Sequence, residues 1–260
     1  MKLEKLHLAY FSPGKYTRKI VYNIAYTLSR GLANQQTNLT AVKGRSVEYH
    51  LGPNDIFLAA LPTYSGRIPS VAPSLLRNYY GVGTPAVAVV TYGNRGYDNQ
   101  LAEMQRVLEE QGFVVAAGAA FVCEHAMSQR VGTGRPDDAD LMKARDFGSQ
   151  VKDMLLSASA PIGISLPGEV PAEPAKAVPG SPSTLDNCVL CMQCYKWCPM
   201  DAIPWNDPMH TDASKCVMCQ GCVRRCPVQA RKVLDEGFQA RVNEMEEKLA
   251  GQRCDSEVFL

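Results

Sequence analysis

The sequence predicts an α/β protein in which a doubly wound, five-stranded parallel sheet precedes a small α+β domain rich in cysteine. Within residues 1–160, apolar runs of strand length alternate with segments whose apolar residues recur at helical spacing. Continuous apolar strands separated by helices are typical of parallel sheets that are covered on both faces. The last third of the chain differs, because eight of the ten cysteines lie between Cys188 and Cys226.

Five apolar segments have the length of buried strands. In chain order they cover 6–11, 39–42, 56–61, 86–92 and 114–122, of which the second is the weakest. Helices are expected where apolar residues recur every three or four positions. These helices lie near 20–28, 70–80, 98–108 and 137–155, and Asp98 is expected to cap the third.

Three loops with small or turn-forming residues follow the first, third and fourth strands. They cover 11–17, 62–68 and 91–98. Ligands of open parallel sheets bind beyond the carboxyl ends of the strands, at the point where the strand order reverses. We therefore expect a cofactor at these three loops.

A proline-rich segment separates the two halves of the chain. Its six prolines are Pro161, Pro167, Pro171, Pro174, Pro179 and Pro182. Such density disfavours helices and strands, and it predicts an extended linker. The predicted organisation is a sheet domain over 1–160, a linker over 161–183, a cysteine-rich domain over 184–234, and a helix with a tail over 235–260.

The cysteines form two copies of the pattern C-x2-C-x2-C-x3-C-P. The copies are Cys188, Cys191, Cys194, Cys198 with Pro199, and Cys216, Cys219, Cys222, Cys226 with Pro227. Each cysteine of the second copy stands 28 residues after its mate, as Cys216 does after Cys188. Cubane iron–sulfur clusters need four thiolates, and a loop with cysteines three apart supplies three of them. The pattern predicts two [4Fe-4S] clusters.

In bacterial ferredoxins with this pattern, the fourth cysteine of each run ligates the other cluster. We therefore assign cluster 1 to Cys188, Cys191, Cys194 and Cys226, and cluster 2 to Cys216, Cys219, Cys222 and Cys198. Disulfides are disfavoured because the chain shows no export signal. Structural zinc is disfavoured because it usually takes separated pairs of cysteines.

Besides the cysteine runs, five short segments are characteristic: 11–17 (FSPGKYT), 62–69 (PTYSGRIP), 92–98 (YGNRGYD), 120–126 (AFVCEHA) and 134–137 (GRPD). Through these segments and the cysteine runs, the chain resembles the flavodoxin–ferredoxin fusion proteins of anaerobic bacteria and archaea over nearly its full length. The resemblance implies a flavodoxin-like domain that binds FMN, followed by a ferredoxin-like domain with two [4Fe-4S] clusters.

The resemblance also implies which residues contact FMN. The first loop would wrap the phosphate at the start of a helix, where free N–H groups favour an anion, through Ser12, Pro13, Gly14, Lys15, Tyr16 and Thr17. The other loops would flank the ring system with Pro62, Thr63, Tyr64, Ser65, Gly66, Arg67, Thr91, Tyr92, Gly93, Asn94, Tyr97 and Asp98. The first loop departs from the family pattern, because Gly14 replaces a hydroxyl residue and Lys15 replaces a glycine.

Three residues near the expected flavin are candidates for a catalytic role. Arg67 and Arg95 could contact an anionic substrate, a partner carboxylate or the reduced flavin. His125 could donate a proton. The alternatives are solvated loop charges for the two arginines and a hydrogen-bonded structural histidine.

Two functions remain open at this level. The protein is an electron relay between the clusters and FMN for a partner protein, a ferredoxin or an oxidoreductase. Alternatively, it is an FMN-dependent reductase that acts directly on a small substrate over the flavin. A net charge of +1 favours neither a nucleic acid nor a membrane surface. We expect a cytoplasmic protein of an anaerobe, and a homodimer is left open.

Overall fold

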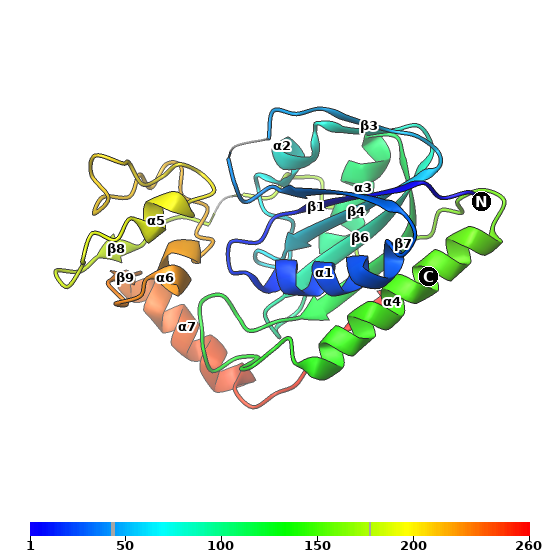
Figure 1. Ribbon diagram of the computed structural model, residues 1–260. Helices are drawn as coiled ribbons and strands as arrows, with labels where there is room; N and C mark the ends of the chain where they lie inside the picture. Colours follow the sequence, from blue (N-terminus) through cyan, green and yellow to red (C-terminus); the bar gives the residue numbers. More distant parts are fainter. Residues whose placement is uncertain (43–44, 177) are drawn as a thin grey trace.

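A computed structural model describes residues 1–42, 45–176 and 178–260 (Figure 1). Within these ranges the main element is a six-stranded sheet. Across the sheet its strands are β10 (Glu257–Phe259), β7 (Phe113–Val122), β6 (Thr84–Tyr92), β4 (Asp55–Pro62), β1 (Lys5–Tyr10) and β2 (Ala33–Asn38). All neighbours pair in parallel except β10 with β7. The five parallel strands therefore have the order 2-1-3-4-5 of flavodoxin-like folds.

Helices cover both faces of the sheet, as the continuous apolar strands predicted. Helices α1 (Tyr16–Leu28) and α4 (Asp138–Ser157) bury their apolar residues against one face. Helices α2 (Ala72–Leu76) and α3 (Gln100–Glu110) pack on the other face. The carboxyl ends of β1, β4 and β6 meet at one edge, which places the loops after them side by side.

The second strand of the chain ends just before the segment predicted to form it. Strand β2 covers Ala33–Asn38, whereas residues 39–42, the predicted strand, form turns and bends. The strand has a neighbour on one side only, and its side chains are exposed or half-buried. Such an edge strand needs no apolar residues, so its polar sequence ANQQTN carries no strand signal.

Two helix predictions also differ from the structure. The helix expected near 70–80 ends at Leu76, because β5 (Tyr79–Gly81) follows and pairs in parallel with β3 (Tyr49–Leu51). Asp98 does not cap α3. The N-cap residue is Asn99, without a capping side-chain bond, and Asp98 itself has a φ of 41°.

The C-terminal tail supplies a strand that the sequence did not predict. Strand β10 pairs antiparallel with β7, with Val258 opposite Ala119. It adds a sixth, antiparallel strand to the five parallel strands of the predicted sheet. A three-residue strand shows too little alternation for a sequence pattern to reveal it.

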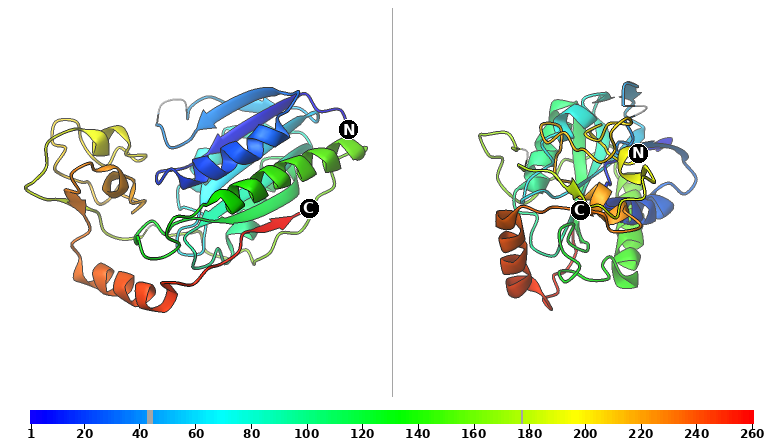
Figure 2. Two further views of the ribbon diagram at one scale, coloured as in Figure 1. Left: turned by 60° about the horizontal axis from the view of Figure 1, so that its bottom comes forward. Right: turned by 90° about the vertical axis from the view of Figure 1, so that its left-hand side faces the viewer.

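The cysteine-rich domain contains short elements around the two runs. They are β8 (Ser183–Thr184), α5 (Gln193–Lys196), α6 (Gly221–Arg225) and β9 (Arg231–Lys232). The sequence repeat is also a backbone repeat, because left-handed residues of the first run have mates 28 positions later. These pairs are Leu190 and Met218, Met192 and Gln220, and Asp201 and Gln229. Helix α7 (Glu236–Leu249) then leads back to the sheet domain (Figure 2).

The proline-rich connector has no helix or strand over 161–176 and 178–182; Ala177 lies outside the described residues. It is nevertheless partly anchored, because Leu166 is buried against Gly118 of β7. None of the helices in the described part of the chain combines the length and apolar character of a membrane span.

Candidate functional site

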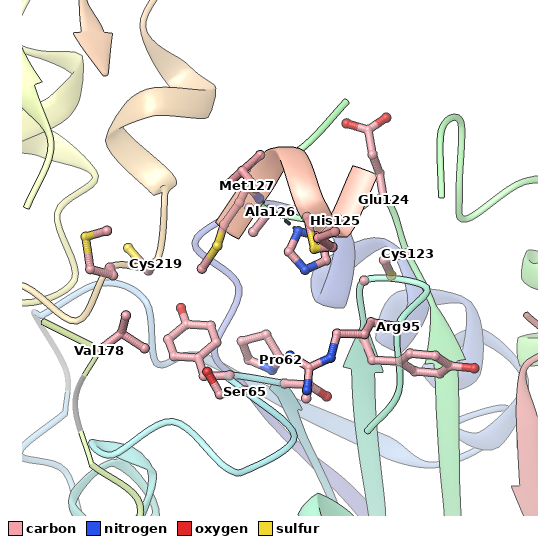
Figure 3. Close-up of a pocket in the computed structure, with 18 of the residues that line it drawn as sticks. Pro62, Ser65, Arg95, Cys123, Glu124, His125, Ala126, Met127, Val178 and Cys219 are labelled. Carbon is pink, nitrogen blue, oxygen red and sulfur yellow. Dashed lines mark hydrogen bonds between the residues drawn. The ribbon is translucent and has the colours of Figure 1, made fainter. Parts of the chain in front are cut away.

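A cavity of about 530 Å³ lies at the edge of the sheet where the three predicted loops meet. Its walls also include the second cysteine run, through Val217, Met218 and Cys219, and the inner face of α7. In Figure 3, Cys219 and Val178 lie on one side of the cavity and Arg95 on the other. The cavity therefore joins the two domains.

Most of the predicted loop residues line this cavity. They are Pro13, Gly14, Tyr16, Thr17, Pro62, Thr63, Tyr64, Ser65, Thr91, Tyr92 and Gly93, together with the candidates Arg95 and His125. The others lie outside the lining that the described residues form: Ser12, Lys15, Gly66, Arg67, Asn94, Tyr97 and Asp98.

Three of the residues outside the lining make contacts elsewhere. Arg67 is ion-paired with Glu103, whose side chain is only 2% exposed, so its charge is directed away from the cavity. The amide of Asn94 donates to the carbonyl oxygen of Gln252 (2.9 Å), and Tyr97 donates to the carboxylate of Glu257 (2.9 Å). Asn94 and Tyr97 therefore hold the C-terminal tail.

The backbone of the first loop accommodates the two residues, Gly14 and Lys15, at which its sequence departs from the family pattern. Lys15, at the usual glycine position, has the left-handed conformation with a φ of 74°. The Ser12 hydroxyl accepts a hydrogen bond from the Arg18 N–H (3.0 Å), and the Thr17 hydroxyl is bonded to that of Thr91 (2.7 Å). These two hydroxyls thus stabilise the loop, and Gly14 leaves its backbone open to the cavity.

His125 lies directly against Gly93. A Cβ atom on Gly93 would come within 2.5 Å of the imidazole Cδ2, so only glycine permits this approach. The Nδ1 atom accepts a hydrogen bond from the Met127 N–H (3.2 Å). Burial, and then the charges of Arg95 and Arg224, lower the pKa of His125 to about 4. At neutral pH the ring is uncharged, and its proton is on Nε2.

Two tyrosines line the cavity in different ways. Tyr92 donates to the carbonyl oxygen of Asp255 (2.9 Å), so its hydroxyl anchors the tail. The buried hydroxyl of Tyr64 has no hydrogen-bond partner among the described residues. Burial raises the pKa of Tyr64 well above its usual value, and the nearby thiols of Cys219 and Cys216 add to this effect. A buried hydroxyl normally has a partner, which fits a ligand with a hydrogen-bond acceptor at this position.

Two smaller spaces lie inside the cysteine-rich domain, and each is lined by four cysteines from both runs. One is lined by Cys188, Cys191, Cys194 and Cys226. The other is lined by Cys198, Cys216, Cys219 and Cys222. These are the two sets of the crossed assignment. All ten cysteines of the chain are free thiols.

Backbone amides donate to sulfur at equivalent positions of the two runs. The Ala202 N–H donates to Cys198 Sγ (3.3 Å), and the Ala230 N–H donates to Cys226 Sγ (3.2 Å). Hydrogen bonds of this kind stabilise thiolates and influence the potentials of iron–sulfur clusters. The two sets of four cysteines, and the backbone N–H groups that donate to their sulfur atoms, therefore fit two clusters.

The sequence missed the residues that α7 and the second run contribute to the cavity. From α7 they are Phe238, Arg241, Val242, Glu244, Met245, Lys248 and Leu249. Their helical spacing predicted an amphipathic segment, but spacing alone does not show what its apolar face covers. The role of Arg224, which contacts the loop after β7, had no signal in the sequence.

Comparisons with known proteins find a family match in the C-terminal half and similarities to solved structures. The family model described as "4Fe-4S dicluster domain" matches residues 187–230. Among solved structures, the chain is similar to a flavodoxin from the domain Archaea (15% identity, TM-score 0.43, covering 58% of this chain and 99% of that chain). No curated protein sequence matches the chain.

Two bacterial flavodoxins give similar values. The flavodoxin of Streptococcus pneumoniae TIGR4 shows 15% identity and a TM-score of 0.42, and oxidised flavodoxin 2 of Bacillus cereus shows 16% and 0.40. Each comparison covers 58% of this chain and 99% of that chain.

The strand order and the matched domain define a class of protein, an α/β electron-transfer protein with an iron–sulfur domain. In particular, a flavodoxin-like N-terminal region is followed by a 4Fe-4S dicluster domain at residues 187–230. Eight cysteines in two such runs imply two clusters.

Proposed function

We propose that this protein relays electrons between two [4Fe-4S] clusters and an FMN bound in the 530 Å³ cavity, on behalf of a partner protein. When bound, the clusters exchange single electrons and FMN exchanges up to two. The partner is a ferredoxin or an oxidoreductase, since the sequence shows no dinucleotide motif of its own.

The observation that carries this proposal is the shared wall of the cavity. Cys219, a proposed ligand of cluster 2, lines it together with Tyr64 and Thr17 from the sheet domain. The ligands of cluster 1 line a different space, which does not include residues of the sheet domain. The three proposed sites thus follow the order cluster 1, cluster 2, FMN.

The residues around the cavity suit a flavin mononucleotide. Gly14 and Thr17 lie at the start of α1, where unpaired N–H groups and the helix dipole favour a phosphate. Tyr64 and Tyr92 offer aromatic faces to a flat ring. Neutral His125 presents a proton on Nε2, and α7 contributes the apolar side chains of Phe238, Val242 and Met245 to the lining.

Reduction by a one-electron donor tests the proposal. The protein is prepared without oxygen, loaded with iron, sulfide and FMN, and mixed with a reduced ferredoxin in a stopped-flow instrument. We expect flavin bleaching at least tenfold faster than in protein that holds FMN but no clusters. Protein that binds iron and sulfide but no flavin under these conditions would contradict the proposal.

The reductase alternative is favoured by one observation, the two guanidinium groups of Arg95 and Arg241 in the cavity lining. They could bind an anionic substrate beside the flavin. Turnover of a small acceptor by the reduced protein alone, saturable in acceptor and weakened by Arg95→Gln, would support the reductase. Electron delivery only in the presence of a partner protein supports the relay.

A further inference from the structure

Helix α6 lies between ligands that belong to different clusters. Cys222 is inside the helix and lines the space of cluster 2, whereas Cys226 follows it and lines the space of cluster 1. The helix has only five residues, and no side chain caps its N-terminus. A helix this short is unstable by itself, so its position depends on what the thiols of Cys222 and Cys226 bind.

Arg224 extends from α6 onto the loop that follows β7. Its guanidinium donates to the carbonyl oxygens of His125, Ala126 (3.0 Å) and Ser128 (2.8 Å), and to the carboxylate of Glu124 (2.5 Å). Both members of the ion pair are largely buried, with side chains 16% exposed. One side chain therefore donates to four acceptors in the loop that carries His125 to the cavity.

The same helix also supports the first loop. Arg225 donates to the carbonyl oxygen of Pro13 (3.2 Å), and Gly221 packs against Pro13 so closely that an added Cβ would lie 3.2 Å from it. Tyr16 donates to the Glu124 carboxylate (2.9 Å), which links the first loop to Arg224. The first loop and the loop after β7, which both line the cavity, are thus held by contacts with α6.

We propose that Arg224 is a positioning residue that couples FMN binding to cluster assembly. The inference rests on the proposed function, because it takes the cavity to be the FMN site. When Cys222 binds cluster 2 and Cys226 binds cluster 1, α6 is fixed and Arg224 keeps the loop after β7 over the cavity. Without clusters the helix and its contacts are released, and FMN binds more weakly. Because coupling between binding free energies is reciprocal, FMN must also strengthen the binding of the clusters.

Titrations of FMN test the coupling. Quenching of flavin fluorescence is measured without oxygen for the wild type and for Arg224→Gln, each with clusters and after removal of iron by a chelator. We expect the clusters to strengthen FMN binding at least tenfold in the wild type. In Arg224→Gln this difference disappears, and Arg224→Lys restores only part of it because an ammonium cannot reach all four acceptors.

The reciprocal measurement uses the equilibrium partition of iron between the protein and the chelator. Excess FMN should raise the iron that the wild type retains at a given chelator concentration, but not the iron that Arg224→Gln retains. Arg106→Gln is the matched control, because this arginine lies on α3 and, among the described residues, forms its ion pair with Glu110 at the surface (3.8 Å). Glu124→Gln, which keeps Arg224 but weakens the ion pair, should give an intermediate coupling.

The outcomes separate the two proposals. Equal FMN affinity of the wild type with and without clusters would overturn the coupling while leaving the relay intact. The coupling would also be overturned if Arg224→Gln, at wild-type iron and sulfide content, kept the full difference in FMN affinity between the forms with and without clusters. Failure of every form to bind FMN would overturn both. If the Arg224→Gln variant fails to fold, the FMN affinity of the wild type with and without clusters still tests the coupling.

Discussion

Lys15 adopts a backbone conformation that L-residues disfavour. Its φ of 74° lies in the left-handed region, at the position where the flavodoxin-like proteins it resembles have glycine. Its side chain lies outside the cavity lining that the described residues form. This conformation costs about 1–2 kcal/mol for a residue with a Cβ atom.

Lys15→Gly is therefore expected to raise the free energy of unfolding by about 1 kcal/mol, after the larger chain entropy of glycine is subtracted. The melting temperature should rise by roughly 2–4 °C, which calorimetry of the loaded protein can detect. Lys15→Ala is the control, since it removes the charge but keeps the strain. A glycine variant no more stable than the alanine variant would refute this explanation.

The candidate residues show what a sequence conveys about single side chains. Arg95 and His125 line the cavity, but Arg67 pairs with Glu103, which lies 36 residues further along the chain. The loop composition predicted that a cation would be near the cavity. It carried no information on the carboxylate with which that cation pairs, because a pair so distant in sequence depends on how α3 packs.

At the scale of elements, β10 closes the sheet on one side. It pairs with β7, which would otherwise present unpaired N–H and C=O groups at an edge. Ser256, just before it, accepts from the Val122 N–H and donates to Asp140 (both 3.1 Å). This attachment also fixes the C-terminal end of α7, which lines the cavity.

Deletion of residues 255–260 is expected to expose β7 and to loosen α7. Hydrogen exchange of the Gly118 to Ala120 amides should accelerate, and FMN should dissociate faster, while iron content stays unchanged. Ser256→Ala provides the graded comparison, with an expected loss of about 1 kcal/mol in unfolding free energy. Unchanged exchange in the deleted protein would show that β10 does not protect β7.

At the scale of the whole molecule, the two cysteine runs are interlocked. The last cysteine of each run lines the space formed by the other run. As a result, damage to one run affects both proposed clusters, and only one of the two spaces shares Cys219 with the cavity. The interlocking predicts an unusual pattern among serine variants.

We expect Cys198→Ser to change the same paramagnetic resonance signal as Cys219→Ser, which belongs to the other run. Likewise, Cys226→Ser should match Cys191→Ser. The physical reason is that each pair shares one ligand set. The spectra of the four reduced variants are compared with that of the wild type. A match between Cys198→Ser and Cys191→Ser instead would mean that each run holds its own cluster.

Much of this protein is determined by local sequence. The spacing of Cys188 to Cys226 predicts the dicluster domain, because cluster ligation requires thiolates at short fixed intervals. The apolar runs predict the parallel strands, because both faces of the sheet are buried. By contrast, β2 and β10 lie at edges of the sheet, where burial places little demand on sequence.

Only the tertiary structure decides how the two domains meet. It brings Cys219, rather than any ligand of the other cluster, to the cavity, and it places Arg224 against the loop of His125. These contacts join residues about 100 positions apart. They arise from the packing of α6 and α7 on the sheet domain, and no periodicity or spacing along the chain encodes a contact between surfaces so distant in sequence.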